Sequence, residues 1–321
     1  MRHLLAIDRL SREEIEAILD RAESFAEVGR RDIKKVPTLR GRTVVTLFYE
    51  SSTRTSSSFE LAAKRLSADL ISVKAAGSSV DKGESLKDTV ATLSAYDPAA
   101  IVIRHPYAGA AQMVAGWTTA AVVNAGDGKH EHPSQALLDV YTLRRRLGSL
   151  DGKRIWIVGD VLHSRVARSN LIAFQRMGAE VTVCGPPTLI PRGIEELGCE
   201  VSHSLERLGE AEVVYALRMQ QERMSESFVP SLREYAATFQ IDTRKLNPRQ
   251  LLMHPGPVNR GVELSGEAID SPQSLIAEQV AAGLVVRMAI LYELLAGGER
   301  PAPLSEGEGA GARPTPIGQP A

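Results

Sequence analysis

Short apolar runs alternate with helix-length amphipathic segments along most of this chain, and this alternation leaves few folds open to it. Runs typical of strands lie at 43–48, 70–73, 99–105, 120–124, 154–158, 180–184, 212–217 and 250–253. Helical patterns lie between them at 54–67, 85–96, 108–116, 134–147, 165–177, 188–197 and 229–239. Repeated strand–helix units predict mostly parallel sheets with right-handed crossovers. We therefore expect an α/β fold.

The length of the chain and the restart of this pattern after 134–147 indicate two domains. A chain of 321 residues is long enough for about two cores. A capping box at Ser11–Glu14 predicts one further helix near the start of the chain. The apolar helix 273–296 is expected to pack against more than one element. From 297 to 321 the chain is rich in Gly and Pro and has almost nothing to bury, so we predict disorder there.

Composition excludes several classes of protein. The net charge is −1, which provides no basic patch for nucleic acid. No apolar run approaches the roughly 20 residues of a membrane helix, and the N-terminus does not resemble a signal peptide. Cys184 and Cys199 lie apart without metal spacing and fit reduced thiols. We expect a soluble cytoplasmic protein without nucleic-acid or membrane partners.

The segment Ser52-Thr53-Arg54-Thr55 predicts an anion site. It follows the predicted strand 43–48 and opens a helix, so free backbone N–H groups and the helix dipole meet there. The hydroxyl groups add donors, and the Arg54 guanidinium can bind phosphate in bidentate fashion. The site is expected to bind phosphate. The alternative is a Ser/Thr-rich N-cap with one solvated arginine.

Further polar groups follow other predicted strands, at the edge where α/β proteins bind ligands. They are Arg104-His105, His130–Gln135, Asp160–Arg165, Arg218–Gln220 and His254–Pro257. The arginines in this set and Arg54 indicate substrates rich in phosphate and carboxylate. No Walker-type motif and no G-x-G-x-x-G after a strand is present, so nucleotide binding is disfavoured.

His130 and His132 suggest metal ligands at first sight, but they lack a third partner at a known zinc spacing. A neutral His132 that donates a hydrogen bond to a carbonyl oxygen fits the surroundings better. A purely structural histidine is the other alternative. No Ser-His-Asp or Cys-His arrangement and no Gly-x-Ser-x-Gly occurs, so covalent catalysis is not expected. We predict no metal and no cofactor.

Three motifs in order resemble the carbamoyl-phosphate half of a transcarbamoylase. They are Ser52-Thr53-Arg54-Thr55, Arg104-His105-Pro106 and His132-Pro133-Ser134-Gln135. The segments Ser79–Glu84, Arg218–Gln220 and His254–Pro257 are similar to the catalytic chains of the aspartate enzymes. The Asp-x-x-x-Ser-Met-Gly and His-Cys-Leu-Pro motifs expected of an ornithine enzyme are missing. The resemblance extends from about residue 2 to 296.

The resemblance implies a role for each matching residue. Catalytic roles are implied for Arg54, Thr55, Lys82, Arg104 and His132. Substrate binding is implied for Ser52, Thr53, Ser79, Gln135, Arg165, Arg218, Gln220, Pro255, Gly256 and Pro257. Residues 52–55 are expected to hold the phosphate. Thr55, Arg104 and His132 are expected to polarise the carbamoyl carbonyl, while Gln135 holds the carbamoyl amide.

The aspartate side follows in the same way. Arg165, Arg218 and Gln220 are expected to bind the aspartate carboxylates. The backbone carbonyls of Pro255 and Gly256 are expected to accept hydrogen bonds from the carbamoyl NH₂ and the attacking amine. The implied reaction is direct attack of L-aspartate on carbamoyl phosphate without a covalent enzyme intermediate. It gives N-carbamoyl-L-aspartate and phosphate, the second step of de novo pyrimidine biosynthesis.

The resemblance also implies an architecture of two similar-sized α/β domains, each a mostly parallel sheet flanked by helices. We expect a carbamoyl-phosphate-binding domain at 1–131, an aspartate-binding domain at 132–272, and a return of helix 273–296 to the first domain. The family assembles as a homotrimer with sites shared between subunits, so Ser79 and Lys82 are expected to reach the neighbouring site. The sequence leaves open whether a regulatory chain or a dihydroorotase partner binds.

The sequence leaves other functions open. A transcarbamoylase for another amine is one, although a cationic acceptor calls for an acidic pocket rather than Arg165, Arg218 and Gln220. A non-catalytic phosphate-binding or assembly subunit is another, and a phosphatase or sugar-phosphate isomerase is a third. Lys82 by itself reads as a solvated loop lysine. Leu162-His163-Ser164 has no assigned role, and Gly256 is smaller than the apolar residue of some relatives.

Overall fold

The structure is a computed structural model in which residues 1–74, 83–220 and 228–296 are described. Its first half contains a four-stranded sheet with the order β2-β1-β3-β4. The strands are β1 (Thr43–Phe48), β2 (Asp69–Lys74), β3 (Ala100–His105) and β4 (Ala121–Asp127). Every pairing is parallel. The chain adds β2 on one side of β1 and β3 on the other, so the strand order reverses between β1 and β3.

The second half contains a five-stranded sheet with the order β7-β6-β5-β8-β9, and it is also parallel throughout. The strands are β5 (Arg154–Val158), β6 (Glu180–Cys184), β7 (Glu200–Ser202), β8 (Val213–Ala216) and β9 (Leu251–Met253). Here the order reverses between β5 and β8. Ligands of open α/β sheets bind at such reversals, beyond the carboxyl ends of the strands. Each half therefore has its own binding edge, and the predicted α/β fold is confirmed.

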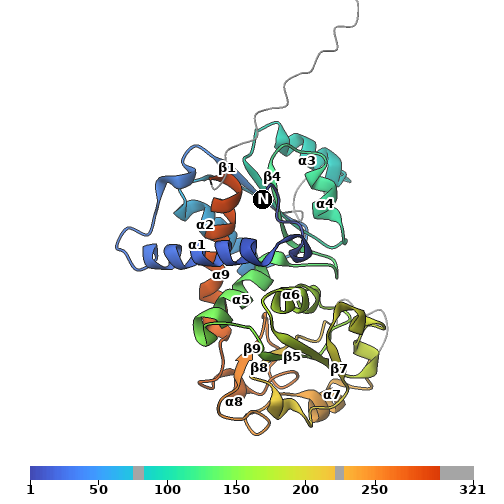
Figure 1. The fold of residues 1–321 in the computed structure, drawn as a ribbon. Coiled ribbons are helices and arrows are strands. Elements are labelled where there is room, and N and C mark those ends of the chain that lie inside the picture. The colour runs from blue at the N-terminus through green and yellow to red at the C-terminus, as the bar shows by residue number, and fades with distance from the viewer. Residues whose placement is uncertain (75–82, 221–227, 297–321) are drawn as a thin grey trace, which may run out of the picture.

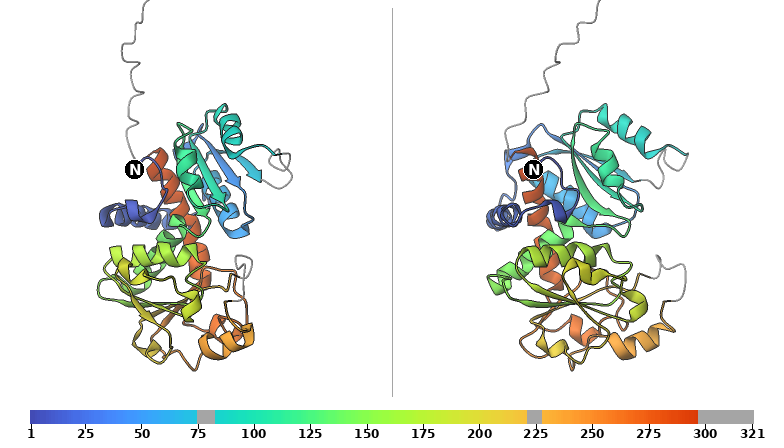
Figure 2. Two further views of the ribbon diagram at one scale, coloured as in Figure 1. Left: turned by 90° about the vertical axis from the view of Figure 1, so that its right-hand side faces the viewer. Right: turned by 45° about the vertical axis from the view of Figure 1, so that its right-hand side comes forward.

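Helices cover both sheets (Figures 1 and 2). They are α1 (Arg12–Val28), α2 (Thr53–Arg65), α3 (Leu86–Ser94), α4 (Ala110–Ala115), α5 (Pro133–Leu147), α6 (Arg165–Arg176), α7 (Leu232–Phe239), α8 (Gly266–Ile269) and α9 (Ile276–Leu295). The predicted capping box at the start of α1 is confirmed, because Ser11 accepts from the Glu14 N–H and the Glu14 carboxylate accepts from the Ser11 N–H.

The strands of the first sheet are apolar on both faces because both faces are buried. Val44 and Phe48 belong to a core shared with α1, α2 and α9, whereas Val45 and Leu47 face a second core beneath α3 and α4. The first of these cores continues through α5 and α6 to the second sheet. Helix α9 contacts α1, α2 and α5, and it extends from the lower half of Figure 1 into the upper half. These shared helices join the two halves.

One predicted element is wrong. The helix expected at 188–197 is replaced by two short 3₁₀ segments, Pro187–Leu189 and Ile194–Leu197. Pro191 and Gly193 lie between them, and Gly193 has φ +75°, a conformation that ends helical pairing. Strand β7, of three residues, and helix α8, of four, were not predicted. The exposed loop predicted around 76–85 lies largely outside the described residues, and the tail 297–321 lies wholly outside them.

Candidate active site

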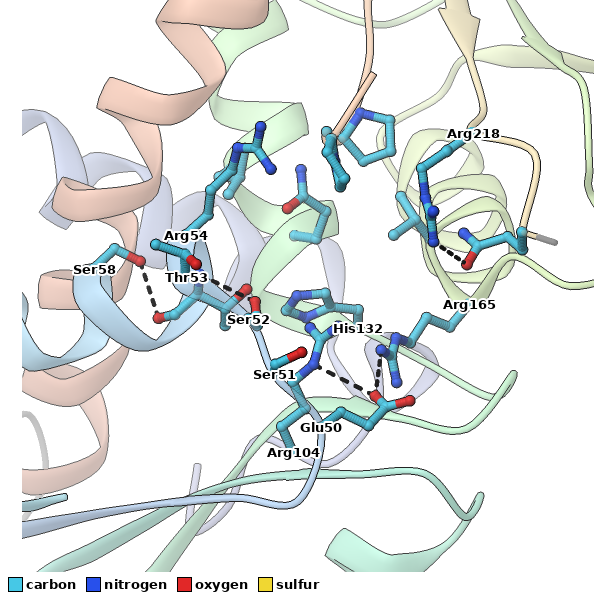
Figure 3. A pocket seen from close by; sticks show the side chains of 18 of the residues that line it. Glu50, Ser51, Ser52, Thr53, Arg54, Ser58, Arg104, His132, Arg165 and Arg218 are labelled. Carbon is cyan, nitrogen blue, oxygen red and sulfur yellow. Dashed lines mark hydrogen bonds and ion pairs between the residues drawn. The ribbon is translucent and has the colours of Figure 1, made fainter. Parts of the chain in front are cut away.

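A cleft of about 1210 Å³ lies between the two binding edges. Its lining includes segments that follow β1, β3, β8 and β9, together with the first turns of α2, α5 and α6 (Figure 3). Among the residues assigned from the sequence, the cleft is lined by Ser52, Thr53, Arg54, Thr55, Arg104, His132, Gln135, Arg165, Arg218, Gln220, Pro255, Gly256 and Pro257. Ser79 and Lys82 lie outside the described residues.

The predicted phosphate segment, residues 52–55, forms the N-terminus of α2, as expected from the sequence. Ser52 is the N-cap residue, with an extended backbone, and its hydroxyl accepts a hydrogen bond from the Thr55 N–H at 3.4 Å. The Ser58 hydroxyl donates to the Thr55 carbonyl at 3.2 Å (Figure 3). In an α-helix the N–H groups of the first positions, here Thr53 and Arg54, have no carbonyl four residues back within the helix, which is the arrangement that binds anions.

Arg54 lies against the segment His254–Pro257 from the other half of the chain. Gly256 has φ +64°, and a Cβ atom built there would lie 2.8 Å from Cζ of Arg54. The Arg54 guanidinium therefore fills the space that a side chain at 256 would take. The Gly256 N–H donates to His254 Nδ1 at 2.9 Å, and burial lowers the pKa of His254, so that imidazole is neutral at pH 7.

Glu50 is the main cleft residue that sequence reasoning missed. Its Oε2 accepts from Arg165 Nη2 at 2.6 Å and lies 3.4 Å from Arg104 Nε (Figure 3). Glu50 follows β1 and Arg104 lies near the end of β3 in the first sheet, whereas Arg165 is the first residue of α6 in the second half. One carboxylate thus connects arginines of both halves. The available signal was a lone acidic residue directly before the Ser/Thr-rich segment.

His132 and Gln135 open helix α5. His132 is the N-cap residue, and its N–H donates to the Ser169 hydroxyl at 2.9 Å. Gln135 is buried in the first turn, and its Nε2 donates to Asp139 Oδ1 at 3.0 Å. Buried contacts hold both residues beside the phosphate segment.

The unassigned stretch Leu162-His163-Ser164 supports the Arg218 side of the cleft. Asp160 accepts from the Gln220 N–H at 3.2 Å, and His163 Nδ1 lies 2.8 Å from the same carboxylate. Ser164 is the N-cap of α6 and accepts from the Ala167 N–H. Arg218 donates to the Gln220 side chain at 3.2 Å, as Figure 3 shows. Asp160 and His163 therefore anchor the backbone beside Arg218.

The remaining predictions concern metal ligands and membrane helices. Among residues 1–74, 83–220 and 228–296, no group of three or more His, Cys, Asp or Glu side chains is arranged to hold a metal ion. In the same ranges, no helix combines the length and the apolar character needed to cross a bilayer. His130, one of the two candidate ligands, instead lies 3.1 Å from Asp127.

The two parallel-sheet halves and the arginine-lined cleft between them define an α/β protein that binds anionic substrates. Family models match both halves. Residues 2–145 match "Aspartate/ornithine carbamoyltransferase, carbamoyl-P binding domain", and residues 151–294 match the "Asp/Orn binding domain" of the same family. The chain belongs to the aspartate/ornithine carbamoyltransferase family, and the predicted resemblance is confirmed.

Individual relatives favour the aspartate branch. The aspartate carbamoyltransferase catalytic subunit of Acidothermus cellulolyticus is 56% identical over 303 residues, covering 93% of this chain and 94% of that protein. The subunit of Pelotomaculum thermopropionicum is 55% identical, covering 92% and 97%. Aspartate transcarbamoylase from Trypanosoma cruzi, solved in complex with carbamoyl phosphate and aspartate, is 32% identical with a TM-score of 0.84, covering 92% and 97%. The catalytic subunit from M. Jannaschii is 36% identical with a TM-score of 0.81, covering 93% and 100%.

Proposed function

We propose that this chain transfers the carbamoyl group of carbamoyl phosphate to the amine of L-aspartate, giving N-carbamoyl-L-aspartate and phosphate. The observation that carries the proposal is the meeting of Arg54, Arg104, Arg165 and Arg218 with the N-terminus of α2 in one cleft. Carbamoyl phosphate and aspartate together bring one phosphate and two carboxylates, which four guanidinium groups and a helix N-terminus can neutralise.

The proposed roles follow the position of each residue in the cleft. Residues 52–55 hold the phosphate, while Thr55, Arg104 and His132 donate to the carbonyl oxygen as negative charge develops there. Gln135 and the backbone carbonyls of Pro255 and Gly256 hold the carbamoyl NH₂ and the attacking amine. The amine attacks the carbonyl carbon, the bond from carbon to the phosphate oxygen breaks, and the departing phosphate takes the amine proton. Alignment of the two substrates supplies much of the remaining acceleration.

We assign carbamoyl-phosphate binding to residues 1–131 and aspartate binding to 132–272, with 273–296 returning to the first domain. The contacts of α9 with α1 and α2 support that return. We place the protein in the cytoplasm as a homotrimer in pyrimidine biosynthesis, with Ser79 and Lys82 entering the neighbouring site. Co-purification from the native host tests whether a regulatory chain or a dihydroorotase joins the trimer.

The assay that tests the function is colorimetric detection of the ureido product, with L-aspartate and L-ornithine run side by side. We expect product with aspartate and none with ornithine, because the cleft offers cationic groups to a second carboxylate. Product with ornithine alone would assign the chain to the other branch of the family. Product with neither amine, from folded protein, would leave phosphate binding as the remaining activity to measure.

Glu50→Gln is expected to lower kcat/KM for aspartate by about tenfold, because a charge-assisted hydrogen bond contributes roughly 1.5–3 kcal/mol. The amide cannot neutralise Arg104 and Arg165 together, so the two halves lose a common anchor. Steady-state kinetics on Glu60→Gln provide the control, since Glu60 accepts from Ser56 on α2 and does not line the cleft. Wild-type kinetics in Glu50→Gln would contradict a role for this carboxylate in the reaction.

A mixture of inactive Lys82→Ala and inactive Arg54→Ala chains is expected to regain activity if the site is shared. In a mixed trimer some sites combine an intact Arg54 with an intact Lys82 from the neighbouring subunit. Each variant is purified, the two are dissociated and reassociated, and the activity of isolated mixed trimers is measured. Reassociated trimers of each single variant are the controls. Mixed trimers that stay as inactive as these controls would contradict the shared site.

A further inference from the structure

A buried carboxylate behind the cleft connects residues from both substrate-binding edges. Asp139 lies on α5, one turn after Gln135, and is fully buried. Its Oδ1 accepts from Gln135 Nε2 at 3.0 Å and from Gln279 Nε2 at 2.7 Å. Its Oδ2 accepts from Asn170 Nδ2 at 2.9 Å and from the Tyr215 hydroxyl at 2.7 Å. The four donors come from α5, α9, α6 and β8, so the carboxylate binds elements of both halves (Figure 1).

The four donors favour the ionised form of Asp139. A carboxylate offers about four acceptor positions, and all four are used here. A protonated carboxyl group would turn one oxygen into a donor that faces another donor, which leaves buried polar groups unsatisfied. A neutral asparagine in its place would create the same conflict through its NH₂ group.

The ionised carboxylate also determines which way two glutamine amides point. An acceptor can bind the NH₂ end of an amide and not its oxygen. With Nε2 of Gln135 bound to Asp139, its Oε1 is the end left for the cleft that Gln135 lines. With Nε2 of Gln279 bound to Asp139, its Oε1 accepts from the His254 N–H at 3.0 Å. His254 in turn leads into the Pro255–Pro257 segment.

We propose that Asp139 is a positioning residue for the reaction: it aims the Gln135 oxygen at the carbamoyl NH₂ and, through Gln279, fixes the His254–Pro257 segment. This inference rests on the proposed function of the cleft. A carbonyl-type oxygen is the group required to accept from an NH₂ donor, so an inverted Gln135 amide repels the substrate it should hold. The same carboxylate therefore prepares both the carbamoyl side and the amine side of the cleft.

The pH dependence of kcat distinguishes this positioning role from a merely structural one. Burial raises the pKa of Asp139 to about 6, against the lowering effect of its four hydrogen bonds, of which that from Tyr215 is the largest. The charged and titratable groups that face it are Tyr215 on β8 and Arg287 on α9, while α5 and α6 contribute the neutral amides Gln135 and Asn170. The active form is ionised, so activity falls as pH falls through the pKa of Asp139.

The experiment compares the variants Asp139→Asn, Tyr215→Phe and Tyr141→Phe in the full-length protein. Asp139→Asn is expected to lower kcat at saturating aspartate by at least tenfold. Tyr215→Phe removes one donor, which raises the pKa of Asp139 further, so the acid limb of kcat against pH should move upward by half a unit or more. Tyr141→Phe is the matched control. The Tyr141 hydroxyl also donates to a carboxylate, that of Glu23, at 2.7 Å, and Tyr141 lies on the helix that carries Asp139. Its acid limb should stay in place.

Wild-type kcat and KM in Asp139→Asn would overturn the proposal, and so would an unmoved acid limb in Tyr215→Phe. If Asp139→Asn does not fold, the pH profile of Tyr215→Phe decides alone. Wild-type turnover with carbamoyl phosphate and aspartate is measured first, so a failure of the proposed function appears there and not in the variants. Calorimetric binding of N-(phosphonacetyl)-L-aspartic acid, the ligand of one Trypanosoma cruzi structure, repeats the comparison without turnover. Asp139→Asn should weaken that binding at least tenfold, and unchanged binding counts against the proposal.

Discussion

Arg54→Ala is expected to lower kcat by about 10²–10³-fold, the largest effect of any single substitution in the cleft. A preorganised donor aimed at charge that develops in the transition state contributes roughly 3–4 kcal/mol when tested by removal. Arg54 is the second residue of α2 and belongs to the predicted phosphate segment 52–55, and its guanidinium packs against Gly256. Alanine removes the positive charge that we propose faces the departing phosphate. It also leaves a gap beside Gly256, in the segment proposed to hold the carbamoyl group. Initial rates at saturating concentrations of both substrates measure the loss.

Lys64→Ala is the matched control for this variant. Lys64 is a cation on the exposed face of the last turn of the same helix, away from the cleft. It should keep wild-type kcat, and both variants should show wild-type circular dichroism. An Arg54 variant with kcat within about twofold of wild type would refute the assignment of the phosphate site, since a twofold change is below 0.5 kcal/mol.

Arg218→Ala is expected to raise KM for aspartate about 10²-fold while KM for carbamoyl phosphate changes little. Truncating one member of a buried, hydrogen-bonded charge pair costs roughly 2–5 kcal/mol, because the partner charge is left unpaired. Here the proposed partner is a carboxylate of aspartate. Arg218 follows β8 in the second half, remote in sequence from the phosphate segment. The effect should therefore be confined to one substrate, which two-substrate kinetics can resolve.

Arg244→Ala controls for general loss of positive charge in the same half. Its guanidinium side chain is 89% exposed and pairs with Asp242. This variant should behave as wild type toward both substrates. Equal increases in both KM values in Arg218→Ala would contradict a role specific to aspartate and would indicate a distorted cleft.

All strands except the short β7, and their order along the chain, could be predicted because both sheets are buried on both faces. Burial requires continuous apolar runs such as 43–48 and 154–158, and parallel pairing requires a crossover between them. Polar residues at strand ends then indicated the binding edges. The helix predicted at 188–197 was wrong because the prediction followed the apolar spacing alone. The backbone preferences of Pro191 and Gly193 interrupt a helix there.

The sequence by itself determined the α/β class, the helix start at Ser52 and the set of residues that resembles a carbamoyltransferase site. These are local properties, since they depend on residue type and spacing within single segments. The tertiary structure decided that Glu50 joins Arg104 to Arg165, that Gly256 admits Arg54, and that Asp139 collects donors from four elements. Those contacts join residues up to about 200 positions apart. Their geometry is determined by how the two sheets and α9 pack together, and no spacing along the chain encodes it.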